Sequence, residues 1–139
     1  NLMFKNQKGF TLLELIVVIA IIAILATVTM WSISSYKAKN DDAVVKAGIK
    51  TVINQAEIYN LNNGGSYANM CDPLSDSVVT AALNQIKFSA VDFDPAVNCV
   101  DSNQDWVVWA ELKGGGGTWC ADARNFAGFG AKSAGNYCQ

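Results

Sequence analysis

The chain carries a long apolar run near its N-terminus, and this run contains a single ionisable side chain. Residues 10–31 read FTLLELIVVIAIIAILATVTMW, and Glu14 is the only charged residue among them. About 20 apolar residues are enough to cross a bilayer as a helix. A carboxylate in such a segment costs about 2.5–3.5 kcal/mol at the bilayer centre and less near the interface. We therefore expect Glu14 to serve a function and to have a partner.

A partner for Glu14 would arise if the chain were cut between Gly9 and Phe10. The new α-amine at Phe10 would lie four residues before Glu14, on the same face of a helix. An amine and a carboxylate placed in this way neutralise each other, within one chain or between neighbouring chains.

The residues around this point resemble the prepilin motif of type IV pilins and pseudopilins. A short basic leader, Gly9, Phe10, the sequence Thr-Leu-Leu-Glu and an unbroken apolar run carry the resemblance. It implies that a prepilin peptidase cuts after Gly9 and methylates Phe10, and that Glu14 is the assembly carboxylate. An ordinary secretory signal would carry an Ala-x-Ala-like site after its apolar core. We find none between residues 20 and 38 and expect the apolar segment to be retained.

The apolar run continues into what we predict is one helix over about residues 11–61. No Pro or Gly occurs from Phe10 to Lys46, and Gly48 is the one weak point before Gly64. The first half is apolar all round. The second half is amphipathic, with an apolar stripe at helical spacing that consists of Val45, Ile49, Val52, Ala56 and Tyr59. The Asn-Asn-Gly-Gly sequence at 62–65 is expected to end the helix.

The rest of the chain predicts a small head. A short helix is expected within residues 74–86, starting near Ser75 or Asp76 and carrying Val78, Val79, Ala82, Leu83 and Ile86. Residues 106–112 predict a strand that is apolar on both faces, and residues 114–117 predict a hairpin loop leading to a return strand at 118–121. Residues 97–100 are expected to pair on the other edge. Residues 124–139 show no clean period and receive no assignment.

These segments define a domain organisation and a fold class. We expect a leader peptide at residues 1–9, a transmembrane or filament-core helix at 10–31, and a head at 32–139 that includes the amphipathic half-helix at about 32–62. The fold class is α+β. A long N-terminal helix, apolar and then amphipathic, packs on a small antiparallel sheet, as in the type IV pilins that the chain resembles.

Composition excludes several classes of function. Ten basic and twelve acidic residues give a net charge of −2, and loss of Lys5 and Lys8 with the leader makes it −4. Nucleic-acid binding needs clustered Lys and Arg, so no direct nucleic-acid site is expected. The chain has no His, which excludes His-based catalysis and zinc sites with His ligands. We expect the protein to be no enzyme and to need no cofactor.

Four cysteines lie in the predicted head, at Cys71, Cys99, Cys120 and Cys138. Four cysteines allow three disulfide connectivities. Adjacent pairing is favoured because it makes compact closures and ties down both irregular stretches. The pilin resemblance points the same way, since pilins often carry a C-terminal loop bounded by a disulfide, and Cys120–Cys138 looks like one. A redox or metal role is the weaker alternative because no Cys-x-x-Cys occurs.

Asp101, Asn103 and Asp105 match the opening of a calcium-binding loop. The next position is Trp106 where an EF-hand needs Gly, and position twelve is Leu112 where it needs Glu. A polar turn before a strand is the preferred interpretation, with weak calcium binding as the alternative.

Other side chains have a structural and a functional interpretation. Trp106 and Trp119 are expected in the core, whereas Phe126 and Phe129 are better candidates for an exposed aromatic patch. Asp41 and Asp42, with Lys37 and Lys39, are expected either to be solvated just outside the bilayer or to form ion pairs between neighbouring stems.

The sequence therefore predicts a structural subunit. Before assembly it would cross the cytoplasmic membrane once, with the head outside, and it would then join an extracellular helical filament of identical subunits. The resemblance implies three partners: a prepilin peptidase, an assembly platform and an ATPase. A pilus subunit for adhesion, motility or DNA uptake is the leading interpretation. A type II secretion pseudopilin and a membrane-anchored binding module are the alternatives.

Overall fold

The structure is a computed structural model that describes residues 9–139, without the side chains of residues 30–32, 96 and 97. All of the predicted leader except Gly9 lies outside the described residues. The chain divides into two units. The first ends at Tyr36, and the second, the head unit, is Lys37–Gln139.

Helix α1 (Leu12–Asn62) confirms the predicted long helix to within one residue at each end. Its end follows from two glycines with left-handed backbone, Gly64 and Gly65, whose φ angles are 67° and 87°. The Gly65 N–H donates to the Asn60 carbonyl at 2.8 Å, and the Asn63 N–H donates to that of Tyr59 at 3.0 Å. These bonds satisfy carbonyls that the last helical turn leaves open.

In the first unit, the apolar side chains of α1 are exposed on every side. The exposed fraction is 76 % at Leu12, 59 % at Ile22 and 64 % at Val28. Within the part of the chain that the structure describes, α1 is the one helix long and apolar enough to cross a membrane. Within the described part of the first unit these side chains have no apolar cover, and a surface of this kind is favoured by contact with lipid or other apolar helices.

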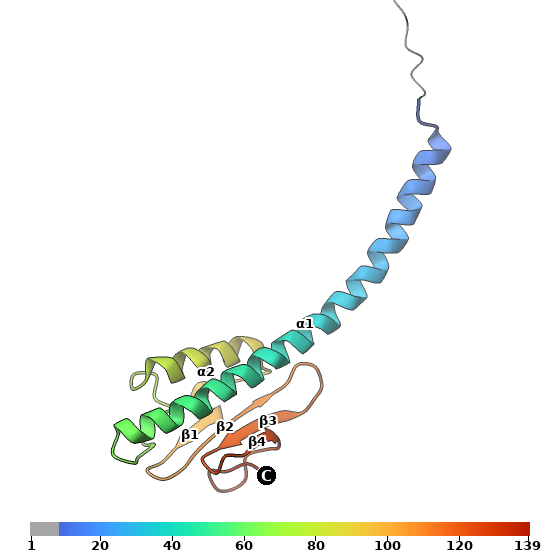
Figure 1. Cartoon of the computed structure of the whole chain (residues 1–139). Coiled ribbons are helices and arrows are strands. Elements are labelled where there is room, and N and C mark those ends of the chain that lie inside the picture. Colours follow the sequence, from blue (N-terminus) through green and yellow to red (C-terminus); the bar gives the residue numbers. More distant parts are fainter. Residues whose placement is uncertain (1–8) are drawn as a thin grey trace, which may run out of the picture. The chain divides into compact units, whose positions relative to one another are not determined.

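In the head unit, the second half of α1 and helix α2 (Ser77–Ser89) lie side by side over one face of a sheet (Figure 1). The predicted stripe on α1 is buried at all five positions, from Val45 to Tyr59. Asp76 caps α2 by accepting from the N–H groups of Val78 and Val79. The buried face of α2 carries Val79, Ala82, Leu83 and Ile86 as predicted.

One residue of the predicted helix, Val78, is 45 % exposed. Val78 is in the first turn of α2 and about 100° around the helix from Val79, at the margin of the buried face. Val78 therefore belongs to the predicted helix, as expected, but lies outside its buried face.

The sheet has four antiparallel strands in chain order, β1 (Cys99–Asp101), β2 (Trp106–Glu111), β3 (Thr118–Asp122) and β4 (Ala127–Phe129). The predicted hairpin of β2 and β3 and the pairing of β1 with the other side of β2 are confirmed. The strand expected from residue 97 begins only at Cys99, because Pro95–Asn98 forms the short helix α3. Strand β4 was not predicted, and it pairs with β3 through Trp119 and Phe129.

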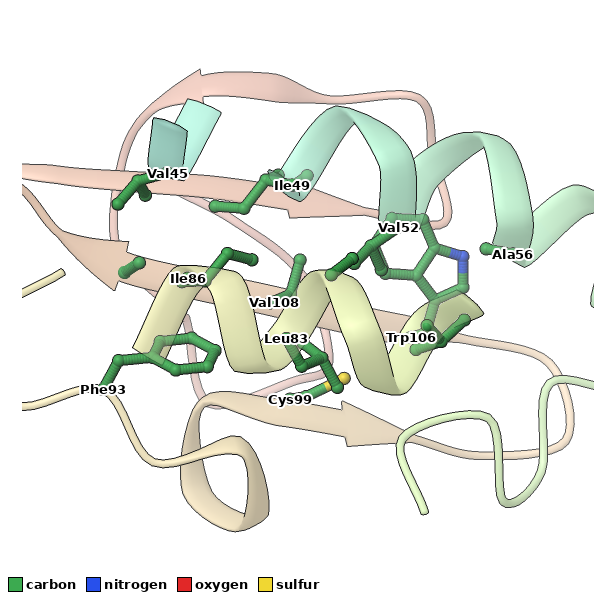
Figure 2. Packing of buried hydrophobic residues seen from close by; sticks show 14 of the residues in the cluster. Val45, Ile49, Val52, Ala56, Leu83, Ile86, Phe93, Cys99, Trp106 and Val108 are labelled. Carbon is green, nitrogen blue, oxygen red and sulfur yellow. The ribbon is translucent and has the colours of Figure 1, made fainter. Parts of the chain in front are cut away.

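The two faces of β2 pack against different partners, which explains why the strand is apolar on both. Trp106, Val108 and Ala110 belong to the core between sheet and helices. Figure 2 shows Trp106 and Val108 meeting Val52 of α1 and Leu83 of α2. On the opposite face, Val107 packs with the Cys120–Cys138 disulfide. The C-terminal segment thus covers the face of the sheet that the helices leave open.

The start of α1 in the head unit holds the loop between β2 and β3. The Lys113 ammonium is 3.2 Å from the Asp41 carboxylate, and the Gly114 N–H donates to Asp42 at 3.1 Å. Asp41 and Asp42 were expected to be solvated or to pair between neighbouring stems. Instead they make contacts within the head, because the hairpin of β2 and β3 extends to this end of the sheet.

Asp122 organises the C-terminal segment from a buried position. Its carboxylate accepts from the Arg124 side chain, the Cys138 N–H and the Arg124 N–H, each at 2.9 Å. Burial alone raises the pKa of this carboxyl, but Arg124 and the two N–H donors outweigh it and hold the pKa below its ordinary value. This network was not predicted.

Gly48 allows α1 and α2 to approach closely. A Cβ at this position would lie 2.7 Å from Ile86 Cγ1 and 3.5 Å from the Ala82 carbonyl oxygen. We predict that Gly48→Val lowers the free energy of unfolding of the head by about 1–3 kcal/mol through overpacking. Urea unfolding of the full chain in detergent, followed by tryptophan fluorescence, measures this. Ala43→Val, at an exposed position of the same helix, is the matched control and should change stability by less than about 0.7 kcal/mol. Equal effects of both variants would contradict the close approach.

The Asp122 network predicts a pH dependence. Since the folded state lowers the Asp122 pKa, the stabilisation is complete above the unfolded value of about 3.9 and is lost as pH falls below it. We expect Asp122→Asn to cost about 1–3 kcal/mol at pH 7, because the Arg124 charge loses its partner. The variant should also lose less stability than the natural chain between pH 4 and pH 2.5 in the same urea assay. An Asp92→Asn control, at an exposed position, should follow the natural chain. Parallel pH curves for Asp122→Asn and the natural chain would refute this assignment.

Candidate assembly site

The candidate site lies at the N-terminal end of α1, where Glu14 occupies the first turn of the helix. The Glu14 carboxylate accepts from both the backbone N–H and the hydroxyl of Thr11, each at 2.9 Å. In return, the Glu14 N–H donates to the Thr11 hydroxyl at 3.2 Å. The two residues satisfy each other's polar groups at a helix end that would otherwise leave N–H groups open.

This arrangement is a capping box, which a sequence of Thr, two residues and Glu before an apolar run predicts. Our sequence reasoning missed it, although Thr11-Leu12-Leu13-Glu14 contains the signal. It gives Glu14 a structural role before any cut. The expected role of Glu14 in assembly must therefore be distinguished from capping by experiment.

The partner predicted for Glu14 from sequence, an amine at Phe10, does not exist in the uncut chain. Phe10 follows Gly9, so its nitrogen belongs to a peptide bond. Phe10 is 78 % exposed, and a Cβ at Gly9 would meet no atom within 4 Å. The bond between these residues is thus sterically open.

The helix next to the site satisfies its own polar groups. The hydroxyls of Thr27 and Thr29 donate to the Ile24 and Ala26 carbonyl oxygens, at 2.8 and 3.0 Å. In a helix surrounded by apolar material, such bonds remove the cost of a free hydroxyl. Glu14 is left as the one ionised side chain in residues 10–31.

The predicted disulfide residues form two pairs in the head unit. Cys71 bonds to Cys99 and Cys120 to Cys138, which is the adjacent pairing that the sequence favours. The first pair ties the segment between the helices to β1. The second closes the C-terminal segment over the sheet.

The weak calcium candidates lie in the turn between β1 and β2. The Asp101 carboxylate accepts a hydrogen bond from the Met70 N–H at 2.8 Å. The Asn103 backbone carbonyl accepts one from the Tyr67 N–H. The Asp105 N–H donates to the Ser102 hydroxyl. In the described range, no group of three or more Cys, Asp or Glu side chains is placed to hold a metal. These residues make the contacts of a polar turn.

The aromatic residues divide between core and surface. Trp106 is buried, Trp119 is half-buried, and Phe126 and Phe129 are 38 % and 58 % exposed. Trp119 and Phe129 pack edge to face with ring centroids 4.9 Å apart. The C-terminal part of the sheet therefore presents aromatic surface, as we expected for Phe126 and Phe129.

Comparison with known proteins also identifies the N-terminal segment, which includes the start of α1, as a recognised sequence motif. Residues 4–30 match the family model of the prokaryotic N-terminal methylation motif. The chain is 32 % identical over 106 residues to the type IV wide pilus major component of Thermus thermophilus. The aligned region covers 76 % of this chain and 80 % of that protein.

Two further relatives match with different coverage. The type IV major pilin of Neisseria gonorrhoeae is 33 % identical over 126 residues, 81 % of this chain and 56 % of that protein. The type II secretion system core protein G of Dickeya chrysanthemi is 36 % identical over 61 residues, 44 % of this chain and 40 % of that protein. No solved structure matches the chain.

Residues 12–29 of the matched motif form the exposed apolar part of α1 with its single carboxylate, and the similarity to the Thermus pilus component extends over most of both chains. The chain belongs to the type IV pilin-like family of structural subunits.

Proposed function

We propose that this chain is a structural subunit of a type IV pilus filament that is cut after Gly9 and assembles through its stem, residues 10–31. The observation that carries the proposal is an apolar helical surface, exposed all round, with Glu14 at its start. Such a surface is stable only when lipid or other stems cover it. When a subunit moves from the membrane into the filament, contacts with other stems replace the contacts of its stem with lipid.

Before assembly, the stem crosses the cytoplasmic membrane once. Lys5 and Lys8 precede it and favour a cytoplasmic N-terminus. The head then lies outside the cytoplasm, where its two disulfides are stable. A membrane peptidase cuts after Gly9 and methylates Phe10, and an assembly platform with an ATPase extracts the subunit.

Cutting changes the chemistry next to Glu14. The Phe10 nitrogen turns from an uncharged amide into a cationic amine four residues away on the same helix face. In an apolar filament core an unpaired charge is costly, so the amine and the carboxylate must meet. The pair can form within one chain or between neighbours, and in the second case it fixes how far one stem is shifted along the next.

A type II secretion pseudopilin is the second candidate, because the chain resembles core protein G over 61 residues. That similarity covers 44 % of this chain, whereas similarity to the Thermus pilus component covers 76 %. Deletion of the gene separates the candidates: loss of long surface filaments with normal protein secretion supports the pilus, and the reverse supports the pseudopilin. A membrane-anchored binding module, in which the stem is only a tether, would form no filaments.

Two variants distinguish a role of Glu14 in filament assembly from its role in capping α1. We expect Glu14→Gln to lower filament yield by roughly 100-fold or more, since the variant would leave the amine unpaired in the proposed apolar core. Thr11→Ala removes the capping hydroxyl but keeps the carboxylate, and costs about 0.5–2 kcal/mol at the helix start only. Its filament yield should fall by no more than about tenfold. Filaments sheared from cells are quantified against membrane-inserted subunit. Equal losses in both variants would show that capping is the whole role of Glu14.

The cleavage prediction rests on Gly9. Gly9→Val should block the cut and leave the leader attached, so that intact mass exceeds that of the processed chain by the leader residues. Because a Cβ at Gly9 meets nothing within 4 Å, the variant should fold like the natural chain. Fluorescence-monitored unfolding of the head is the control and should be unchanged. Normal removal of the leader from Gly9→Val would refute Gly9 as the cleavage residue.

A further inference from the structure

The head unit has a pocket between α1 and the β3–β4 edge of the sheet. Its volume is about 480 Å³. We name it the α1–β4 pocket; its lining comprises Lys46, Ala47, Ile49, Lys50, Ile53, Asn54, Trp119, Asn125 and Ala127. Two lysines and two amides surround an apolar floor, and no carboxylate takes part. An occupant that is part apolar and part anionic would match this surface.

The Trp119 ring and the Lys46 side chain lie together in the pocket lining. The Lys46 ammonium lies 4.8 Å from the centroid of the Trp119 ring and 5.2 Å from that of Phe129. Lys50, one turn further along α1, is exposed at the rim. An aromatic side chain entering the pocket would find an aromatic partner in Trp119 and a cation in Lys46.

The opposite flank of the head carries complementary groups. The segment 72–94, which includes α2, has four aspartates and one lysine, a net charge of −3. The Lys113 ammonium also lies at this surface, where it pairs with Asp41 and donates to the Phe88 carbonyl. Two large apolar side chains on the segment are almost fully exposed, Phe88 at 81 % and Leu74 at 96 %. Phe88 is aromatic and is followed four residues later by the exposed Asp92. Phe88 therefore suits the pocket better than Leu74, which offers no ring to Trp119.

The two surfaces face away from each other across α1. Helix α2 packs against the Gly48 side of α1, whereas Lys46 and Lys50 lie about 200° around the helix from Gly48. In Figure 1, α2 and β4 occupy opposite flanks of the head. One chain thus presents an acidic aromatic surface on one side and a basic aromatic pocket on the other. Two different surfaces of this kind can join head to tail, and such contacts give an open helical filament when the rotation between subunits does not close a ring.

We propose that the α1–β4 pocket receives Phe88 from a second copy of this chain, with Asp92 of that copy beside Lys46 and Lys50. A cavity of roughly 150 Å³ is enough to hold a benzene ring, so the pocket accommodates the side chain with room for its flanking residues. The proposal rests on the proposed filament function and adds a second contact, between heads, to the one between stems.

Cross-linking in filaments tests the contact. Gln85→Cys, one turn before Phe88 on α2, combined with Asn54→Cys places one thiol on each surface and keeps Phe88 itself, and the four natural cysteines do not interfere because they are paired in disulfides. Treatment of sheared filaments with a short bis-maleimide should give a ladder of dimers, trimers and longer chains on a denaturing gel. Each single variant, and Gln85→Cys combined with Leu61→Cys outside the pocket, should give no ladder.

A charge exchange provides an independent test. Lys50→Asp and Asp92→Lys should each lower filament yield roughly tenfold, as expected for a partly buried ion pair, and the double variant should recover most of that loss. Thr51→Asp, at an exposed position of α1 that does not line the pocket, is the control and should change yield less than about twofold.

The outcomes separate this inference from the proposed function. Natural filaments whose double-cysteine form gives no ladder, or stops at a dimer, overturn the head contact and leave the pilus assignment intact. The same holds if the charge exchange shows no recovery. A natural chain that forms no filaments when all assembly components are present contradicts the proposed function itself.

Discussion

The need to cover the apolar surface of α1 is the constraint on which the rest of the structure depends. One uninterrupted helix, Leu12–Asn62, satisfies this need in two ways. Its second half buries a stripe from Val45 to Tyr59 against the chain's own sheet and α2. Its first half is apolar on all sides, and its described side chains are exposed. The difference lies in the pattern of side chains, since a one-sided stripe fits a surface and an all-round apolar helix requires an apolar environment.

Glu14 is the ionisable residue within the apolar half of α1, and its carboxylate needs a partner when that half is buried. In the uncut chain the capping box with Thr11 satisfies its carboxylate. In the proposed processed chain a cationic amine appears one helical turn away. The same carboxylate can then cap its helix and neutralise the new charge. A single buried ion pair of this kind stabilises only modestly overall, but it strongly disfavours any arrangement that leaves one charge unpaired. We therefore infer that its main contribution is to the register of the stems.

The sequence predicted those parts of the fold that depend on a period or a turn signal. The long helix, its buried stripe and the Gly-rich hairpin between β2 and β3 follow from spacing alone. Strand β4 was missed because Ala127-Gly128-Phe129 is too short for alternation, and it forms only by pairing with β3. The contacts of Asp41, Asp42 and Asp122 depend on partners 72 or 16 residues away, which no local pattern reveals. At the candidate site, Glu14 was predicted from sequence because a carboxylate in an apolar segment costs free energy. The capping box that it forms with Thr11 also has a sequence pattern, but we did not predict it.

The most direct measurement of the central claim is a high-resolution cryo-electron-microscopy structure of the assembled filament. We expect the stems to form an apolar core that excludes water, with every Glu14 carboxylate within about 4 Å of a Phe10 amine from the same or a neighbouring chain. A filament whose core lacks residues 10–31, or in which Glu14 faces solvent far from any amine, would contradict the account.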